Sequence, residues 1–422
     1  MLTRSLWLLL FTVTLIGTSL AEAQSVFYVR SGANGSNNGS SWTDAYTALP
    51  KTLQRGATYY IADGTYGPYI FNDAESGTKL ITIKKATIAD HGSATGWLNS
   101  YGDGQAYFVG AQDRVLNFTT GYWTFDGNGA IGTYGFKAST LVGDPSPPPG
   151  YRVVSVGVSI PNVLNNITIR SIEIDGRDVP FVDGFGLNKV NNFLLSNYEV
   201  HHLEDDAVEG CHPCTNSIIE YGYHHDSHGG PSGVSRPDAY DIYQFSNFTW
   251  RYNYIVHHSQ MLFFSSSKLV GRADVYGNVF VNTNGGTGSK CINARSTVVM
   301  GPLYIYNNTC AGTNDGFVFS SLHTGVAKNN LFYNISRTFT FGGLAHSHNW
   351  YFNTPIINEP TKQTGVGSPF VSFPTNLRLK AATLSGDTGI GAAYRIDDLN
   401  DAGITRGADG VWDRGAFEYT KN

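Results

Sequence analysis

The segment ADVYGNVFV (273–281) has the form of a short strand, a polar corner that holds Asn278, and a second short strand. The same form recurs in three further segments: NFTWRYNYI (247–255), LYIYNNTCA (303–311) and VAKNNLFYN (326–334). The corner asparagines are spaced by 25, 30 and 22 residues: Asn253, Asn278, Asn308 and Asn330. Repeats of this length are typical of solenoids, in which each unit buries its apolar residues against its neighbours. The pattern predicts stacked coils of short β-strands.

The composition of the 422-residue chain favours an all-β protein with many turns. It contains 49 glycines, 25 tyrosines and 24 phenylalanines but only 3 methionines, and residues of these kinds favour strands and turns over helices. About 400 residues exceed the usual size of one hydrophobic core, so either two domains or one elongated repeat is expected. The net charge of −5 and the lack of a basic run argue against nucleic-acid binding.

The N-terminus has the features of a secretion signal. Arg4 precedes an apolar run from Leu6 to Ile16, and Ala21-Glu22-Ala23 provides the small-x-small pattern of a signal-peptidase site. We therefore expect residues 1–23 to be a signal peptide and 24–422 to be a secreted protein, periplasmic or extracellular. After cleavage no further segment is expected to enter a membrane, and we expect the protein to be a monomer.

Four cysteines in an exported chain predict up to two disulfides. Cys211 and Cys214 would close a small loop, and Cys291 and Cys310 would link neighbouring segments. The alternative for the Cys-His-Pro-Cys stretch (211–214) is a structural zinc site. Export favours the disulfide.

Three other segments resemble the first and last coils of known secreted proteins: FYVRSGANGSNNGSSW (27–42), YYIADGTY (59–66) and DRGAFEY (413–419). With the repeats, they resemble right-handed parallel β-helices of the pectate-lyase-like superfamily. The resemblance implies one all-β solenoid domain with an N-terminal cap, core coils at about 153–345 and a C-terminal flanking segment. It also implies that the corner asparagines form a side-chain ladder. Because this fold hosts lyases, hydrolases, esterases, epimerases and adhesins, it does not decide the chemistry.

Acidic residues recur where three successive coils begin a further strand: VDGFGL (182–187), DDAVEG (205–210) and PDAYDI (237–242). Alignment on the apolar positions gives a first column of Asp183, Asp206 and Asp238, and a second column of Glu209 and Asp241. Stacked strands lie about 4.8 Å apart, so the carboxylates repel and at least one pKa rises, as acid–base catalysis requires. The alternatives are turn-capping aspartates in the first column and a solvated face in the second.

The order VDG, EDDAVEG and SHGG resembles that of polygalacturonase-like hydrolases. The resemblance, with the first column, implies that the catalytic residues are Asp183, Asp205, Asp206, Asp238 and His228. The arginine-x-lysine motif of those enzymes has no match; Arg251 and Lys268 are the nearest basic residues. Carboxyl groups one to two coils apart would suit an inverting hydrolase, which requires about 6.5–9.5 Å.

Basic residues in the next two coils offer β-elimination as the alternative. FFSSSKL (263–269) followed by NAR (293–295) resembles the lysine-then-arginine order of alginate and chondroitin lyases with this fold. Such a lyase neutralises a uronate carboxylate with a cation or a basic side chain, and a base removes the neighbouring proton. Lys268, Arg295 and His228 are the candidate bases. Residues 261–264 are apolar where the resembled enzymes hold calcium with acidic residues.

Three histidine pairs follow the same strand in successive coils: His201-His202, His224-His225 and His257-His258. Stacked imidazoles are candidate ligands of zinc or copper. A strand followed by histidine and a turn is common in β-helix coils, however, so we expect most of the pairs to be structural and assign no metal ligand.

These features predict an enzyme that cleaves a uronate-containing polysaccharide. The favoured chemistry is hydrolysis by the stacked carboxylates without a cofactor. The residues expected to bind substrate are Glu209, Asp241, Arg251, Lys268 and Arg295. The first alternative is a lyase, in which a divalent cation such as calcium could assist. The others are a sugar epimerase and a non-enzymatic surface or binding β-helix.

Overall fold

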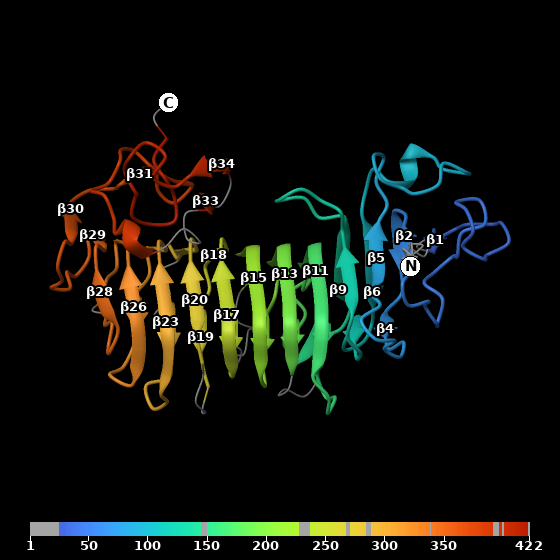
Figure 1. Cartoon of the computed structure of the whole chain (residues 1–422), viewed down its shortest axis with the longest axis horizontal. Coiled ribbons are helices and arrows are strands. Elements are labelled where there is room, and N and C mark those ends of the chain that lie inside the picture. Colours follow the sequence, from blue (N-terminus) through green and yellow to red (C-terminus); the bar gives the residue numbers. More distant parts are fainter. Residues whose placement is uncertain are drawn as a thin grey trace, which may run out of the picture.

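The computed structural model describes residues 25–144, 150–227, 237–266, 271–283, 288–337, 339–390, 396–398 and 401–420. Its strands stand side by side in one row along the long axis of the molecule, from the N-terminal coils in blue to the last coils in orange (Figure 1). Nearly all of them pair in parallel with the strand one coil away. The predicted all-β parallel β-helix is confirmed.

Among the described residues, one sheet of 21 strands, sheet A, forms two sides of the solenoid. Its strands are β1 (Val26–Val29), β2 (Thr58–Ile61), β3 (Gly64–Tyr66), β5 (Ile81–Lys85), β6 (Ala106–Gly110), β8 (Trp123–Asp126), β9 (Phe136–Thr140), β11 (Leu164–Asp175), β13 (Val190–His201), β15 (Cys214–His225), β17 (Phe245–Arg251), β18 (Tyr254–Val256), β20 (Ala273–Tyr276), β21 (Val279–Val281), β23 (Met300–Tyr306), β24 (Thr309–Ala311), β26 (His323–Lys328), β27 (Leu331–Tyr333), β28 (Ala345–Ser347), β29 (Trp350–Phe352) and β30 (Gln363–Gly365).

A second parallel sheet, sheet B, has nine strands within the described ranges and forms the third side. They are β4 (Tyr69–Phe71), β7 (Leu116–Phe118), β10 (Tyr151–Val156), β12 (Val182–Leu187), β14 (Val208–Gly210), β16 (Tyr240–Ile242), β19 (Gln260–Phe264), β22 (Lys290–Ala294) and β25 (Asp315–Val318). Two antiparallel hairpins and two 3₁₀ turns lie outside both sheets: β31 (Phe370–Ser372) with β32 (Asn376–Leu379), β33 (Ile396–Asp398) with β34 (Asp401–Thr405), η1 (Asn99–Tyr101) and η2 (Thr388–Ile390).

One cluster of buried apolar side chains runs through the solenoid from Val29 to Tyr351. It forms because alternate side chains of each short strand point inward. In β5, for example, Ile81 and Ile83 are fully buried while Thr82 between them is partly exposed. The parallel strands span Val26–Gly365, beyond both ends of the range 153–345 expected for the central coils.

The asparagine ladder follows the corner between the two halves of sheet A. Asn278 Nδ2 donates to Asn308 Oδ1 at 2.9 Å, and Asn253 Nδ2 donates to Asn278 Oδ1 at 3.0 Å. Asn308 continues the ladder to Asn330, and Asn330 to Asn349, which the sequence analysis missed. The ladder ends where Asn349 Nδ2 donates to Glu359 Oε2 at 2.9 Å.

We expect Asn278→Ala to destabilise the protein by about 1–3 kcal/mol. The substitution removes the acceptor of the buried backbone N–H of Asn253 and the donor to the buried carbonyl oxygen of Trp250. Urea denaturation measures the effect, with Asn358→Ala as the control, since Asn358 is exposed, has no left-handed φ and accepts a surface hydrogen bond from Lys362. Equal stability of the Asn278 variant and the wild type would contradict the ladder.

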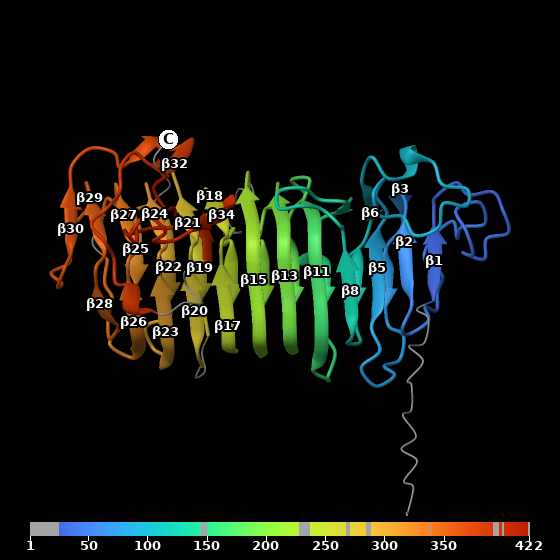
Figure 2. The ribbon, with the colours of Figure 1, turned by 45° about the horizontal axis from the view of Figure 1, so that its top comes forward.

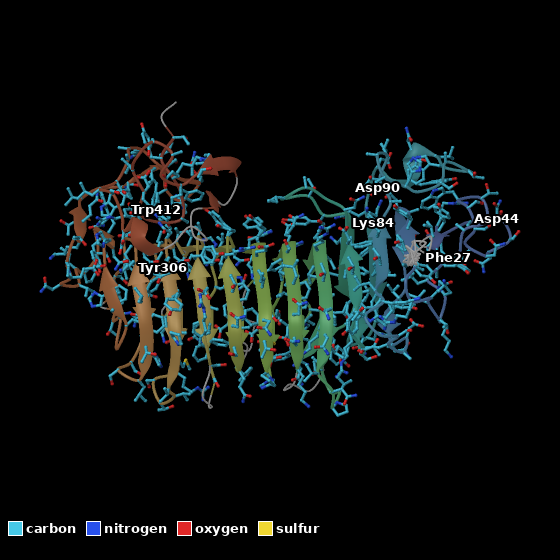
Figure 3. The ribbon with its side chains drawn as sticks, in the orientation of Figure 1. Phe27, Asp44, Lys84, Asp90, Tyr306 and Trp412 are labelled. Carbon is cyan, nitrogen blue, oxygen red and sulfur yellow. A yellow bond between two sulfur atoms is a disulfide. The ribbon has the colours of Figure 1, made fainter. Side chains whose placement is uncertain are left out.

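The C-terminal segment packs along the solenoid, as predicted. Phe370, Leu377 and Phe417 join a second buried cluster with Tyr306 and Trp350. Figure 2 shows β32 beside the strands β21, β24 and β27. Figure 3 shows Trp412 in this segment above Tyr306, and its indole N–H donates to Asn307 Oδ1 at 3.1 Å.

Both predicted disulfides are present, Cys211–Cys214 and Cys291–Cys310. The first closes the turn between β14 and β15, so the zinc alternative for this stretch is wrong. The second joins β22 of sheet B to β24 of sheet A. Over the part of the chain that the structure describes, no helix has the length and apolar character needed to cross a membrane.

Candidate active site

The first acidic column lies where three coils enter sheet B. Asp183 is the second residue of β12, and Asp206 and Asp238 stand two residues before β14 and β16. The backbone N–H of Asp206 donates to Asp183 Oδ1 at 3.1 Å, and that of Asp238 donates to Asp206 Oδ1 at 2.9 Å. Each of these buried carboxylates therefore uses one oxygen to bind the next coil. The aspartates form the column that the sequence alignment predicts, and they also make the capping contacts of the alternative interpretation.

Asp205 brings a third carboxylate beside Asp183 and Asp206. One oxygen of each carboxylate lies within 4.8 Å of the others. We call these three residues the acidic cluster. Like charges this close repel, so the cluster is stable only if it shares protons or binds a cation.

The second column consists of Glu209 and Asp241, which are register partners in β14 and β16. The preceding residues, Val208 and Tyr240, are buried in the core. Because successive strand residues point to opposite faces, Glu209 and Asp241 point outward. Gly186 of β12 is the next member of the same column.

Arg152 of β10 supplies positive charge to the site, and the sequence analysis did not single it out. Its Nη2 donates to Glu209 Oε2 at 2.6 Å, and its Nε lies 3.7 Å from Asp183 Oδ2. Gly186 leaves room for this side chain, since a Cβ there would lie 2.1 Å from Arg152 Cδ. The signal in the sequence is the alignment of YRVVSV (151–156) with VDGFGL (182–187), which pairs Arg152 with Asp183.

Asp238 differs from the acidic cluster because both of its oxygens accept hydrogen bonds. Oδ1 accepts from Ser259 Oγ at 2.7 Å and from the Gln260 N–H at 3.0 Å. Oδ2 accepts from Gln260 Nε2 at 3.0 Å. Asp238 therefore ties its coil to the start of β19, which is a structural role.

Burial raises the pKa of the aspartates in the acidic cluster and of Asp238 and Asp241, and neighbouring negative charge adds to the effect. The pKa of Asp183 and that of Asp206 lie well above the usual range. The pKa is raised to about 6 for Asp205, about 7 for Asp238 and about 6 for Asp241. Ionisation of this site is therefore unfavourable until positive charge is supplied.

We expect Asp241→Asn to be more stable than the wild type at pH 8, by about 1–3 kcal/mol, in a chelating buffer. Burial raises the pKa of Asp241 to about 6, well above its unfolded value. A raised folded pKa contributes stability that is present at low pH and lost as the pH rises through about 6. The advantage of the variant should therefore shrink at pH 5. Thermal denaturation at both pH values tests this, and an advantage independent of pH would contradict it.

The predicted basic residues do not all reach this site. Burial is the largest cause of the raised pKa of Asp241, and the positive charge of Arg295 lowers that pKa. Arg295 therefore lies near the second column. Arg251 is in β17 of sheet A, where its Nε donates to Glu220 Oε2 at 2.6 Å and its Nη1 to Tyr276 Oη at 2.9 Å. His228 and Lys268 lie outside the described residues.

One histidine of each later pair is buried inside the solenoid. His224 Nε2 lies 3.0 Å from Tyr198 Oη, and His258 Nδ1 lies 3.2 Å from the carbonyl oxygen of Pro237. Burial lowers the pKa of both imidazoles, to about 4 for His258. These two histidines are neutral packing groups rather than metal ligands.

A pocket of about 740 Å³ lies over sheet A rather than at the acidic columns. Its wall includes five tyrosines: Tyr134, Tyr221, Tyr223, Tyr252 and Tyr254. Aromatic rings with a polar hydroxyl suit contact with sugar rings. This pocket and the charged side chains of the acidic columns thus lie on different sheets.

Comparison with known proteins identifies the fold. No family model and no curated protein matches the chain. The structure is similar to that of pectate lyase Pel9A, with 17% sequence identity, coverage of 94% of this chain and 97% of that chain, and a TM-score of 0.54. Two weaker similarities are to XylC in complex with xylose (9% identity, 81% and 86% coverage, TM-score 0.45) and to an alginate lyase from Paenibacillus sp. str. FPU-7 (12% identity, 70% and 93% coverage, TM-score 0.36). The chain therefore has the pectate-lyase-like parallel β-helix fold.

Proposed function

We propose that the protein degrades a uronate-containing polysaccharide by β-elimination, with a divalent cation held by Asp183, Asp205 and Asp206. The observation that carries the proposal is the convergence of one oxygen from each of the three carboxylates within 4.8 Å. Calcium binds oxygen ligands at about 2.3–2.6 Å, so two oxygens on one ion are at most about 5 Å apart. The acidic cluster fits this limit, and carboxylates are the ligands that calcium prefers.

The cluster suits a cation better than it suits inverting hydrolysis. An inverting hydrolase needs its carboxyl groups about 6.5–9.5 Å apart so that the sugar and a water fit between them. Asp183 and Asp206 are closer than this, and each also holds a backbone N–H of the next coil. Asp238, the third member of the column, has no free oxygen. The pectate lyase activity named for Pel9A, which has the same fold, also supports elimination.

In the proposed reaction the protein binds the uronate, stabilises its charge and moves one proton. A cation held by the acidic cluster would neutralise the uronate carboxylate and make the adjacent C5 proton more acidic. Arg152 forms ion pairs with Asp183 and Glu209 and so fixes these two side chains. A base removes the C5 proton, the C4–C5 double bond forms, and the C4–O glycosidic bond breaks with protonation of the leaving oxygen. Lys268, His228 and Arg295 are the candidates for the base.

The test is a screen of the purified protein on pectate, alginate, chondroitin and neutral glucans, with calcium and with a chelator. We expect ultraviolet absorbance from an unsaturated product on one uronate polymer, and its loss in chelator. New reducing ends without that absorbance would show hydrolysis instead. Binding without cleavage would favour a non-enzymatic β-helix. We further propose that residues 1–23 direct export, which N-terminal sequencing of the secreted protein tests.

A further inference from the structure

A second group of ligand atoms lies at the ends of β11 and β13, on sheet A. Asp175 and His201 are register partners on adjacent coils, and His202 follows directly. His202 has φ +54°, the left-handed conformation. This conformation ends the strand alternation, so both imidazoles face the same carboxylate rather than opposite sides.

The three side chains converge on one point. His201 Nδ1 lies 2.5 Å from His202 Nδ1, and Asp175 Oδ1 lies 3.9 and 3.8 Å from these two atoms. The circle through the three atoms has a radius of about 2.0 Å, which is the length of a Zn–N or Zn–O bond. Tetrahedral ligands lie about 3.3 Å apart, so an ion bound here would move the two imidazoles apart by several tenths of an ångström.

Neighbouring groups already hold two of these side chains in a ligand orientation. Glu173 Oε1 lies 3.2 Å from His201 Nε2, so it accepts the Nε2–H and leaves Nδ1 as an acceptor that faces His202 Nδ1. Lys137 Nζ lies 3.0 Å from Asp175 Oδ2, so the other oxygen faces the histidines. Histidine ligands of metals characteristically donate their second N–H to a carboxylate in this way.

The site is open on one side. The side chain of His202 is 43% exposed, and those of His201 and Asp175 are 11% and 16% exposed. Three protein ligands with one open side leave a coordination position for water. Imidazole with one carboxylate favours borderline ions such as zinc, copper and nickel, whereas the all-oxygen acidic cluster favours calcium.

We propose that Asp175 Oδ1, His201 Nδ1 and His202 Nδ1 bind one divalent transition-metal ion, with zinc as the representative ion. The site does not depend on the proposed lyase activity. His202 begins the connection that reaches Asp205 three residues later. A metal ion would therefore fix this connection to the end of β11 and hold the acidic cluster in place.

The other exposed histidines offer a matched control. His257 occupies the equivalent position two coils on and has φ +63°. Its Nε2 lies 3.0 Å from Thr283 Oγ1, and it belongs to neither group of converging ligand atoms found among the described residues. Asparagine tolerates the left-handed conformation, so His202→Asn and His257→Asn change the ligand without backbone strain.

The experiment is calorimetric titration of the metal-free full chain with zinc chloride, with thermal denaturation alongside. We expect one zinc per chain, a higher melting temperature with zinc, and the same affinity in His257→Asn. In His202→Asn the affinity should fall by about 100-fold or more, and in Glu173→Gln by about 10–100-fold. Asp183→Asn should lose calcium binding and keep zinc binding, which separates this site from the acidic cluster.

Two results would overturn the proposal. One is the absence of a stoichiometric zinc site in the wild-type chain. The other is unchanged zinc affinity in His202→Asn while its circular dichroism matches that of the wild type. A His202→Asn variant that melts like the metal-free wild type, yet gains no stability from zinc, would support the proposal because the fold is then intact.

Discussion

Replacing Asp206 with Asn should lower the turnover of the polysaccharide by about 10²–10³-fold, the usual cost of removing one stabilising group from a developing charge. In the wild type the backbone N–H of Asp238 donates to Asp206 Oδ1 at 2.9 Å. Asn keeps an oxygen that can accept this hydrogen bond, but it has no negative charge to bind the cation. Burial and the neighbouring Asp238 hold the pKa of Asp206 well above its usual range. Removing this unfavourable charge should leave the melting temperature unchanged or higher.

Asp238→Asn is the matched control for Asp206→Asn. An amide at 238 would place an N–H₂ group against donors of Ser259 and Gln260. We expect a loss of about 1–3 kcal/mol in stability, with a smaller loss of turnover than in Asp206→Asn. Excess calcium should partly restore Asp206→Asn and not Asp238→Asn. Near-normal turnover in Asp206→Asn without added calcium would contradict the cation site, and the reverse order of the two variants would favour the hydrolase.

The fold could be predicted because the asparagines that recur in each coil have a single structural role, the side-chain ladder. The side chain of Asn278 accepts a hydrogen bond from the backbone N–H of Asn253 and donates one to the carbonyl oxygen of Trp250. Corner asparagines spaced by 22 to 30 residues therefore indicate stacked coils of that length. Asn349 was not predicted because it follows Asn330 by 19 residues, which is shorter than the other corner spacings, and the segment between them lacks a clear strand pattern. A shorter coil thus keeps the ladder but breaks the spacing by which the ladder is recognised.

The acidic columns could be predicted, but the different roles of their members could not. Asp206 and Asp238 look equivalent in sequence, yet only Asp206 has an oxygen left for a ligand. That difference comes from Gln260, whose backbone and side chain both reach Asp238. The sequence shows which residue types share a column. It does not show which carboxylate oxygens accept hydrogen bonds from neighbouring groups.

Long-range partners were missed for a related reason. Arg152 is separated from Asp183 by 31 residues and stands just after the proline-rich stretch 143–150, which hides the coil boundary. The three histidine pairs also look alike in sequence. In the first pair the leading histidine His201 has Asp175 as its register partner, whereas His224 of the second pair has Val200 and Ile255 as partners.

Arg152→Met should destabilise the protein by about 3–5 kcal/mol at pH 8 without calcium. Methionine keeps much of the apolar packing of the arginine stem, so the main loss is the positive charge. The arginine side chain is 9% exposed, and that of Asp183 is 5% exposed. Without the guanidinium, Asp183 is a buried carboxylate with carboxylate neighbours, and burial already raises its pKa. Urea denaturation measures the loss.

The cause can be isolated with a second substitution and a control. If the loss comes from uncompensated charge, Asp183→Asn should restore part of the stability of Arg152→Met, so the two effects will not add. Calcium should restore part of it as well, because an ion in the acidic cluster replaces the missing positive charge. Lys328→Met is the control. Lys328 pairs with Asp387 at 2.7 Å, and the two side chains are 29% and 25% exposed, so the loss there should be about 0–1 kcal/mol.

The response of Arg152→Met to calcium also distinguishes a cation-dependent lyase from a hydrolase without a metal, which a loss of activity alone would not do. In a cation-dependent lyase the variant should need a different calcium concentration for half-maximal activity, because Arg152 and the ion compete for the charge of Asp183. In a hydrolase without a metal, calcium should change neither its stability nor its rate. A loss below about 1 kcal/mol, or equal losses with and without calcium, would show that Arg152 does not balance the charge of the acidic cluster.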